Sequence, residues 1–314
     1  MESLRASIVV PSFSRPQLLR GCLAALATQR ITPLEVLVVG REGDADTAAE
    51  AASALGPVRF LTVRVPGHLP PLAHGVAEAH GEVVAFVDDD AEPAEGWLEA
   101  ILRHYARVEV GGVGGLVLQT LTNDLPPSDR IGIVSRLGRF DSGHHDRLPI
   151  DWKPREVDVL RGTNMSFRRS VLLEYRWDAR LNGGAATDYE VDLCSFVRRQ
   201  GLVLVYDPDA AVVHHLGPRR ELGRVESAAA IRSYSHNLVY VTGKALPRGR
   251  ALLGLLHAFL VGNRLAYGLG AAATDTLLGR PPSWNGQLRP ALSGKLAGLT
   301  SLARYARRGA APLP

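Results

Sequence analysis

The chain has 314 residues, a formal net charge of +4, and an apolar fraction of 46%. These values allow one large α/β domain with its own hydrophobic core and a helical extension, or two small domains. Two cysteines, Cys22 and Cys194, are too few for a disulfide framework and so exclude the class of small disulfide-rich secreted domains. The apolar run at the N-terminus is too short for a signal peptide and no cleavage pattern follows it, so we expect a reduced, cytoplasmic protein.

The first ninety residues alternate short apolar runs with segments of helical spacing. We expect strands at residues 7–10, 35–39, 58–63 and 83–87, and helices at residues 15–29, 46–55 and 72–79. Short connections between such elements predict an α/β fold with a mostly parallel central sheet and helices on both faces. Ligands bind such sheets beyond the carboxyl ends of the strands.

The pattern changes after residue 110. Residues 111–115 contain four glycines and predict a flexible segment before a strand at 116–118. Residues 122–155 predict a long irregular loop that is either functional or mobile. The remaining expected elements are strands at 157–160, 202–206 and 211–213 and a helix at about 189–200.

From residue 227 onward the pattern is helical, which predicts a C-terminal helical extension. Residues 251–273 are rich in apolar side chains, but His257, Asn263 and Arg264 interrupt them, which argues against a spanning helix. We prefer a packed amphipathic helix, with a helix lying on a membrane surface as the alternative. Two basic groups lack the interleaved aromatic residues of a base-stacking surface, so nucleic acid is not the expected partner; they are Arg219, Arg220, Arg224, and Arg304, Arg307, Arg308.

An acidic cluster, Asp88, Asp89 and Asp90, directly follows the strand at 83–87. Three adjacent carboxylates repel one another unless a cation lies among them. Carboxylate oxygens favour a hard divalent ion, Mg²⁺ or Mn²⁺, which would neutralise a bound diphosphate. The alternative is a solvated turn after the strand.

A second acidic group, Asp188, Glu190 and Asp192, opens the helix expected at 189–200. One of these carboxylates could act as a general base, although acidic residues also stabilise the first turn of any helix. Two histidine pairs could provide a metal ligand or an acceptor contact, or could be structural; they are His144 with His145, and His214 with His215.

Taken in order, these motifs resemble glycosyltransferase family 2, an inverting family with the GT-A fold. The resemblance covers about residues 6–220. It rests on residues 7–15, 83–91, 96–98, 161–169, 190–194 and 206–214.

The resemblance implies a role for each motif. Asp90 and Asp88, with His214, would hold the metal, and Glu190 would be the general base with Asp188 as its competitor. The residues implied for nucleotide-sugar binding are Pro11, Ser12, Phe13, Arg15, Arg41, Asp44, Asp88 and Asp89. Those implied for acceptor binding are Gly162, Thr163, Asn164, His144 and His145.

The chain departs from the family at two donor-side positions. Residues 40–44 lack the usual uracil-reading aspartate, although Asp44 or Glu42 could replace it. UDP is the preferred nucleotide, but the identity of the base stays open. Residues 72–75 read Leu-Ala-His-Gly, without the asparagine that relatives often carry.

We therefore expect a GT-A domain at residues 1–222, with a nucleotide-binding half at about 1–115 and an acceptor half at 116–222. Residues 223–314 would form a helical region that is a candidate for peripheral contact with the plasma membrane. The expected activity is transfer of a sugar from a nucleotide diphosphate to a glycan or lipid-linked hydroxyl acceptor, in surface glycan or exopolysaccharide synthesis. The alternatives are a nucleotidyltransferase and a catalytically silent nucleotide-sugar-binding protein; a dinucleotide oxidoreductase is disfavoured because no G-x-G-x-x-G follows the first strand.

Overall fold

The computed structural model describes residues 4–119, 125–136, 138, 140–141, 144–183, 188–216, 227–263, 266–279 and 285–313. The first basic group, at residues 219–224, and parts of the long loop at 122–155 lie outside these residues. The chain divides into two compact units. The first unit comprises residues 1–133, 141–175 and 196–218, and the second comprises residues 134–140, 176–195 and 219–314. The predicted domain boundary near residue 222 stays a prediction.

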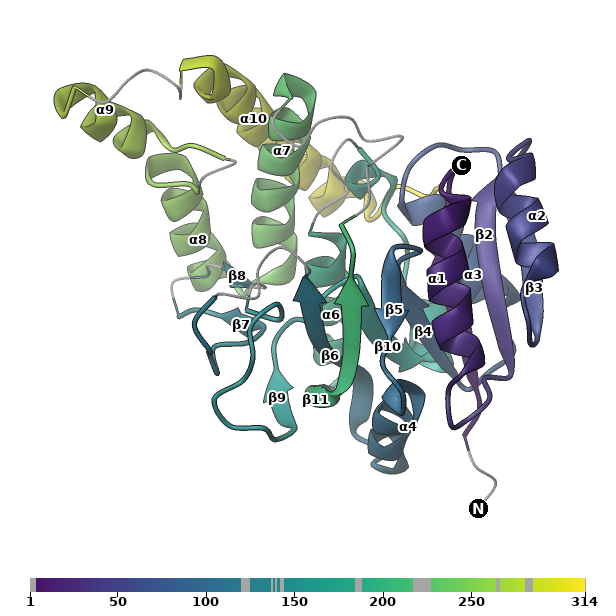
Figure 1. Cartoon of the computed structure of the whole chain (residues 1–314). Helices are drawn as coiled ribbons and strands as arrows, with labels where there is room; N and C mark the ends of the chain where they lie inside the picture. Colours follow the sequence, from purple (N-terminus) through teal and green to yellow (C-terminus); the bar gives the residue numbers. More distant parts are fainter. Residues whose placement is uncertain are drawn as a thin grey trace. The chain divides into compact units, whose positions relative to one another are not determined.

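A nine-stranded sheet forms the centre of the first unit (Figure 1). Its order is β3-β2-β1-β4-β10-β6-β11-β5, and β9 pairs with β11. Pairing is parallel through β3-β2-β1-β4 and between β6 and β11, and antiparallel where β10, β5 and β9 join. The bounds are β1 (Ala6–Pro11), β2 (Glu35–Arg41), β3 (Val58–Val63), β4 (Val83–Val87), β5 (Ala91–Pro93), β6 (Val110–Gln119), β9 (Arg155–Val157), β10 (Asn164–Arg168) and β11 (Val203–His214).

Helices cover both faces of this sheet, as predicted (Figure 1). Side chains alternate along β1, so Ile8 packs with Leu19 and Cys22 on one face while Val9 lies against Gly75 on the other. The first face carries α1 (Pro16–Ala27), α2 (Ala45–Ser53) and α4 (Trp97–Leu102), which η1 (Arg103–Ala106) follows. The second face carries α3 (Leu69–Glu78) and α5 (Arg169–Glu174).

The prediction that residues 111–115 are flexible is wrong. They form the middle of β6, which is buried along almost its whole length. A Cβ atom added at Gly115 would lie 1.9 Å from the backbone oxygen of Ala210, and one added at Gly112 would meet the side chains of Phe167 and Leu204. The glycines are therefore required by close packing of neighbouring strands rather than by mobility.

The two strands predicted at 202–206 and 211–213 form one strand, β11. Its register against β6 shifts between Asp207 and Val212, as in a β-bulge. The buried Asp207 carboxylate stabilises this irregular segment by accepting hydrogen bonds from the Arg103 guanidinium at 2.6 Å and from the backbone N–H of Asp209 at 3.0 Å. Beyond the bulge, β11 pairs antiparallel with β5 and ends at His214.

Helices dominate the second unit, in agreement with the predicted C-terminal extension. Helices α7 and α10 pack closely because Gly294 and Gly298 of α10 face backbone oxygens of α7. Among the described residues, no helix combines the length and apolar character needed to cross a bilayer. The apolar residues 251–273 form most of one helix and the start of another. The bounds are η2 (Ala179–Leu181), α7 (Ala228–Ala245), α8 (Arg248–Leu260), α9 (Leu269–Leu277) and α10 (Asn285–Arg308).

Three further elements include residues of both units. Helix α6 (Tyr189–Arg199) begins in the second unit and ends in the first. The short strands β7 (Ile133–Val134) and β8 (Phe140–Asp141) pair with each other.

Candidate active site

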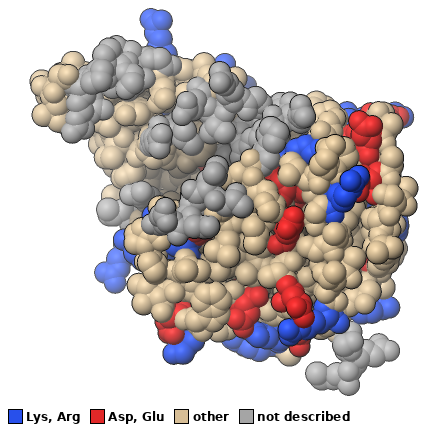
Figure 2. All heavy atoms as spheres, viewed as in Figure 1, with Lys and Arg blue, Asp and Glu red and all other residues tan. Residues whose placement is uncertain are grey.

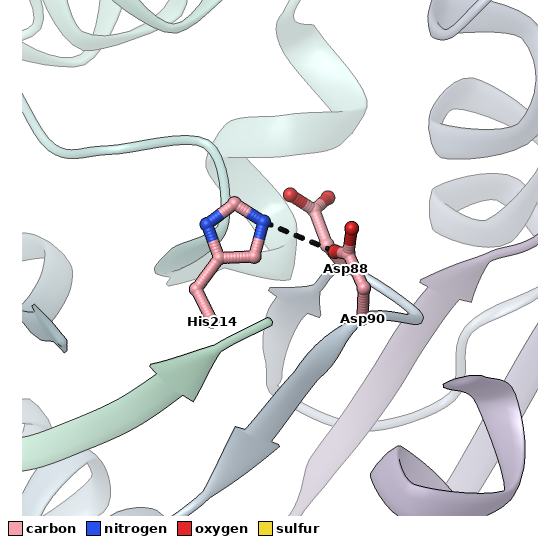
Figure 3. A group of neighbouring side chains, drawn as sticks. All are labelled: Asp88, Asp90 and His214. Atoms are coloured by element: carbon pink, nitrogen blue, oxygen red, sulfur yellow. Dashed lines mark ion pairs between the residues drawn. The ribbon is translucent and has the colours of Figure 1, made fainter. Parts of the chain in front are cut away.

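The three predicted metal ligands lie together at the strand ends of the first unit (Figure 3). Asp88 and Asp90 follow β4, and the pairing of Ala91 with His214 brings the end of β11 beside them. The Nε2 atom of His214 lies 3.1 Å from Oδ1 of Asp90, and the possible ligand atoms of Asp88, Asp90 and His214 all lie within 4.8 Å of one another. Strand register, rather than sequence proximity, therefore assembles this group.

The chemistry of this group fits a divalent metal. Asp90 and His214 are almost fully buried, whereas Asp88 is partly exposed, so the group has one open side. The Nδ1 atom of His214 is buried and has no hydrogen-bond partner within the described part of the chain. No hydrogen bond at Nδ1 therefore determines which tautomer the ring adopts. Two carboxylates and one imidazole are common ligands of a divalent transition metal.

The middle residue of the acidic cluster, Asp89, faces the protein. Its buried carboxylate accepts hydrogen bonds from Ser12 Oγ at 2.7 Å and Arg15 Nε at 3.1 Å. Arg15 also pairs with Asp90, with 3.1 Å between Nη1 and Oδ2. Burial raises the pKa of Asp89 to about 7, while Arg15 and Ser12 act in the opposite direction. Its predicted contact with the nucleotide sugar stays a prediction.

The predicted acceptor segment begins beside Asp88. Gly162 and Thr163 form a turn before β10, and Thr163 donates its hydroxyl hydrogen to Asp88 Oδ2 at 2.8 Å. Asn164 is fully buried: its Oδ1 accepts from the Trp97 indole N–H at 2.9 Å, and its amide donates to two backbone oxygens. Sequence reasoning noted both Trp97 and Asn164 but not their contact, and the acceptor role of this segment stays a prediction.

The predicted nucleotide-binding residues lie at the carboxyl ends of β1 and β2. Pro11 ends β1, and the Arg41 guanidinium at the end of β2 lies 5.7 Å from the centre of the Phe13 ring. Asp44 accepts a hydrogen bond from the backbone N–H of Ser14 at 2.8 Å and from the Thr47 hydroxyl at 2.6 Å. Asp44 thus joins the first loop to the N-terminus of α2, and base recognition by it remains a prediction.

The histidine pair in the long loop is also held by the first unit. His144 has a φ of 64° and its Nδ1 lies 2.7 Å from the Ser128 hydroxyl. His145 is fully buried, with its ring edge-on to Tyr206 at 5.7 Å between centroids. Contact of either histidine with an acceptor stays a prediction.

The predicted catalytic carboxylates lie at the start of α6, within the second unit. Asp188 precedes the helix with a φ of 66°, and Glu190 is in its first turn. Burial, together with the charge of Glu190, raises the pKa of Asp188 to about 8. An aspartate with this pKa is mostly protonated at neutral pH.

A buried charge network that the sequence analysis missed holds the same helical turn. Lys244 of α7 donates to Asp192 at 2.7 Å and to Asp178 at 3.2 Å, and both carboxylates are fully buried. Asp178 also accepts from the Tyr240 hydroxyl at 2.5 Å and the backbone N–H of Ala311 at 3.2 Å. The spacing of Tyr240 and Lys244, four residues apart on a largely apolar helix, was the available signal.

Comparison with known proteins decides the family. The sequence profile described as Glycosyl transferase family 2 matches residues 7–176, more than half of the chain. The chain belongs to glycosyltransferase family 2. The matched segment includes most of β1, the acidic cluster and β10, whereas Glu190 and His214 lie beyond it.

Two curated relatives belong to the same class of enzyme. A pre-mycofactocin glycosyltransferase from Mycobacterium tuberculosis is 28% identical over 145 residues, which cover 45% of this chain and 28% of that protein. A glucosyl-dolichyl phosphate glucuronosyltransferase from Haloferax volcanii is 23% identical over 225 residues, which cover 68% of this chain and 70% of the relative. The aligned part is thus less than a third of the mycobacterial protein.

A solved structure supports the fold over most of the chain. The mannosyltransferase PcManGT from Pyrobaculum calidifontis, in complex with GDP-Man and Mn²⁺, matches with a TM-score of 0.58 and 18% identity. The match covers 96% of this chain and 88% of the other. This likeness confirms the predicted GT-A fold.

Proposed function

We propose that this family 2 protein is an inverting glycosyltransferase that moves a sugar from a nucleotide diphosphate to a hydroxyl acceptor. The acceptor oxygen forms a bond to the anomeric carbon from the face opposite the leaving group. The bond from that carbon to the diphosphate oxygen breaks, and the acceptor proton passes to a carboxylate of the protein. The observation that carries this proposal is the Asp88, Asp90 and His214 group at the strand ends of the sheet.

The metal that this group would hold is Mn²⁺ or Mg²⁺, with Mn²⁺ preferred. Carboxylates suit both ions, whereas an imidazole ligand such as His214 favours a transition metal. When bound, the ion supplies positive charge that stabilises the departing diphosphate. The protein itself supports the site through Arg15, which holds Asp89 and Asp90, and Thr163, which orients Asp88.

We propose Glu190 as the general base. A base has to be ionised before it accepts the acceptor proton. Asp188, with a pKa raised to about 8, holds its own proton at neutral pH and is the weaker candidate. The position of Glu190 in the first turn of α6 agrees with the family resemblance.

The donor base and the acceptor are proposed from the relatives. UDP is our preferred nucleotide. Because PcManGT was solved with GDP-Man, donor sugars of both UDP and GDP should be tested. The name of the Haloferax relative describes a lipid-phosphate-linked sugar acceptor, which supports a glycan on a lipid carrier as the acceptor class here. The reaction would then take place at the cytoplasmic face of the plasma membrane, in surface glycan or exopolysaccharide synthesis.

The test compares Glu190→Gln with Asp188→Asn. We expect Glu190→Gln to lower turnover by about a thousandfold, while binding of a nucleoside diphosphate with Mn²⁺ is unchanged. Asp188→Asn should retain most of the activity because it mimics the protonated aspartate. Turnover is measured as release of nucleoside diphosphate from a panel of UDP- and GDP-sugars, and full activity of Glu190→Gln would contradict the assignment of the base.

A further inference from the structure

Helix α8 packs with its small residues inward and its leucines outward. Ala251, Gly254 and Ala258 are buried, and a Cβ atom added at Gly254 would lie 2.7 Å from Thr242 Cγ2 of α7. The larger side chains of the helix are on the opposite side. Leu252, Leu253, Leu256 and Leu260 are 60%, 44%, 49% and 54% exposed. Helices of globular proteins normally bury leucine, so this exposed stripe requires a partner.

The apolar surface continues beyond α8. Val261 directly follows the stripe, and in α9 Leu269 and Leu277 are exposed while Ala272 is buried. In Figure 2 the described part of the surface over α8 and α9 is largely tan. The leucine surface, defined as the exposed leucines and valine of residues 252–277, therefore comprises side chains of α8, of Val261 and of α9.

The charge of the C-terminal region identifies the partner class. Residues 227–314 contain one acidic residue, Asp275, against eleven lysines and arginines, although the whole chain has 36 basic and 32 acidic residues. Positive charge is thus concentrated in this region, while the rest of the chain is net negative. Several of these cations are exposed, including Arg232, Arg248 and Arg289. Lysine and arginine beside an apolar helical face attract anionic lipid headgroups.

We propose that the leucine surface of α8 and α9 binds an anionic lipid bilayer, lying in its headgroup region without crossing it. A second copy of the chain would bring two strongly basic regions together, which electrostatic repulsion disfavours. A nucleic acid would require stacking aromatic residues in place of leucines. The leucines would enter the acyl boundary while arginines contact the lipid phosphates.

Membrane binding deepens the proposed function. Its biological purpose rests on that function, because a lipid-linked acceptor has to be reached at a membrane surface. The binding itself is a separate property. It can be measured without donor, acceptor or metal, so loss of transfer activity and loss of membrane binding are distinguishable.

The experiment is flotation of the full chain with vesicles of phosphatidylglycerol and phosphatidylcholine in equal parts, and with vesicles of phosphatidylcholine alone. The variant is Leu252→Gln with Leu256→Gln, which changes two exposed side chains and leaves the buried face of α8 intact. The matched control is Leu55→Gln with Leu173→Gln, at two leucines of the first unit that are 80% and 54% exposed.

We expect the wild-type chain and the control to bind the anionic vesicles, and the α8 variant to bind about tenfold more weakly. Binding to phosphatidylcholine alone should be much weaker, because the lipid charge is missing. Equal binding by the α8 variant, or no binding by the wild-type chain, would overturn the proposal. So would a wild-type dimer in light scattering that the α8 variant abolishes, because the leucine surface would then be a self-interface.

Discussion

At the residue scale, Arg15 balances the charge of the acidic cluster. It contacts Asp89 and Asp90, whereas Asp88 is bonded by Thr163. Asp89 is fully buried, so its carboxylate depends on Arg15 and Ser12 in place of water. Asp88 and Asp90 remain for the metal. The three adjacent carboxylates thus divide into one structural residue and two candidate ligands.

Replacing Arg15 by methionine should destabilise the fold. The variant leaves Asp89 buried without its cation, so we expect the free energy of unfolding to fall by about 3 kcal/mol. The matched control is Arg20→Met, because Arg20 is mostly exposed and pairs with Glu50 at 2.7 Å; it should cost less than about 1 kcal/mol. Urea denaturation measures both values. Equal losses in the two variants would show that the buried pair stabilises the fold no more than the exposed pair does.

Asp188 should make stability depend on pH. In the folded state its pKa is raised to about 8, while the unfolded chain releases this proton near the ordinary value of 3.8. The folded state therefore binds more protons between these values, and stability falls as the pH rises through this window.

Relative to Asp188→Asn, the wild-type chain should lose about 5 kcal/mol of unfolding free energy between pH 4 and pH 8. Urea denaturation of both proteins across this range measures the difference. A gap that stays constant with pH would mean that Asp188 is ionised throughout.

At the scale of elements, the first turn of α6 is attached to α7 through Lys244. This lysine lies between two buried aspartates, and its Nζ is 4.9 Å from the centre of the Tyr305 ring of α10. The C-terminal segment joins the same network, because Ala311 contacts Asp178. The helix that carries Glu190 is therefore fixed by contacts from the end of the chain.

Lys244→Met should disrupt this network. Two buried carboxylates would lose their shared cation, so we expect a loss of about 3 kcal/mol in unfolding free energy. Lys153→Met is the matched control, because Lys153 is 74% exposed at its side chain and pairs with Asp151 on the surface; its effect should stay below about 1 kcal/mol. Chemical denaturation at neutral pH compares them, and a Lys244→Met protein as stable as the control would exclude the network as a support of α6.

The same elements show what the sequence could predict. Strands β1, β2 and β4 are continuous apolar runs, so their pattern identifies them and places the acidic cluster at a strand end. Strand β6 has four glycines and no such pattern, because the side chains that fill its space come from Phe167 and Leu204, far away in the sequence. The pairs of Arg15 with Asp89 and of Lys244 with Asp192 join residues 74 and 52 positions apart, which local patterns do not reveal.

At the scale of the whole molecule, family membership and the GT-A fold confirm the two broadest sequence predictions. The metal group was predicted through the resemblance for Asp88, Asp90 and His214, and strand register brings these residues together. The uneven charge of the chain was visible in the sequence, but the outward leucines of α8 were not. Which face of an apolar helix packs inward depends on how closely its own small residues fit against the neighbouring helix, which the sequence does not show.

The central claim is that Asp88, Asp90 and His214 hold the metal that binds the donor diphosphate. The most direct measurement is thermal unfolding of the full chain with UDP or GDP, each with and without Mn²⁺, for the wild type, Asp90→Asn and the exposed control Asp46→Asn. We expect one nucleotide to raise the Tm of the wild type and the control by about 5 °C only when Mn²⁺ is present, and Asp90→Asn to show no such shift. Equal stabilisation without Mn²⁺, or an unchanged shift in Asp90→Asn, would contradict the claim.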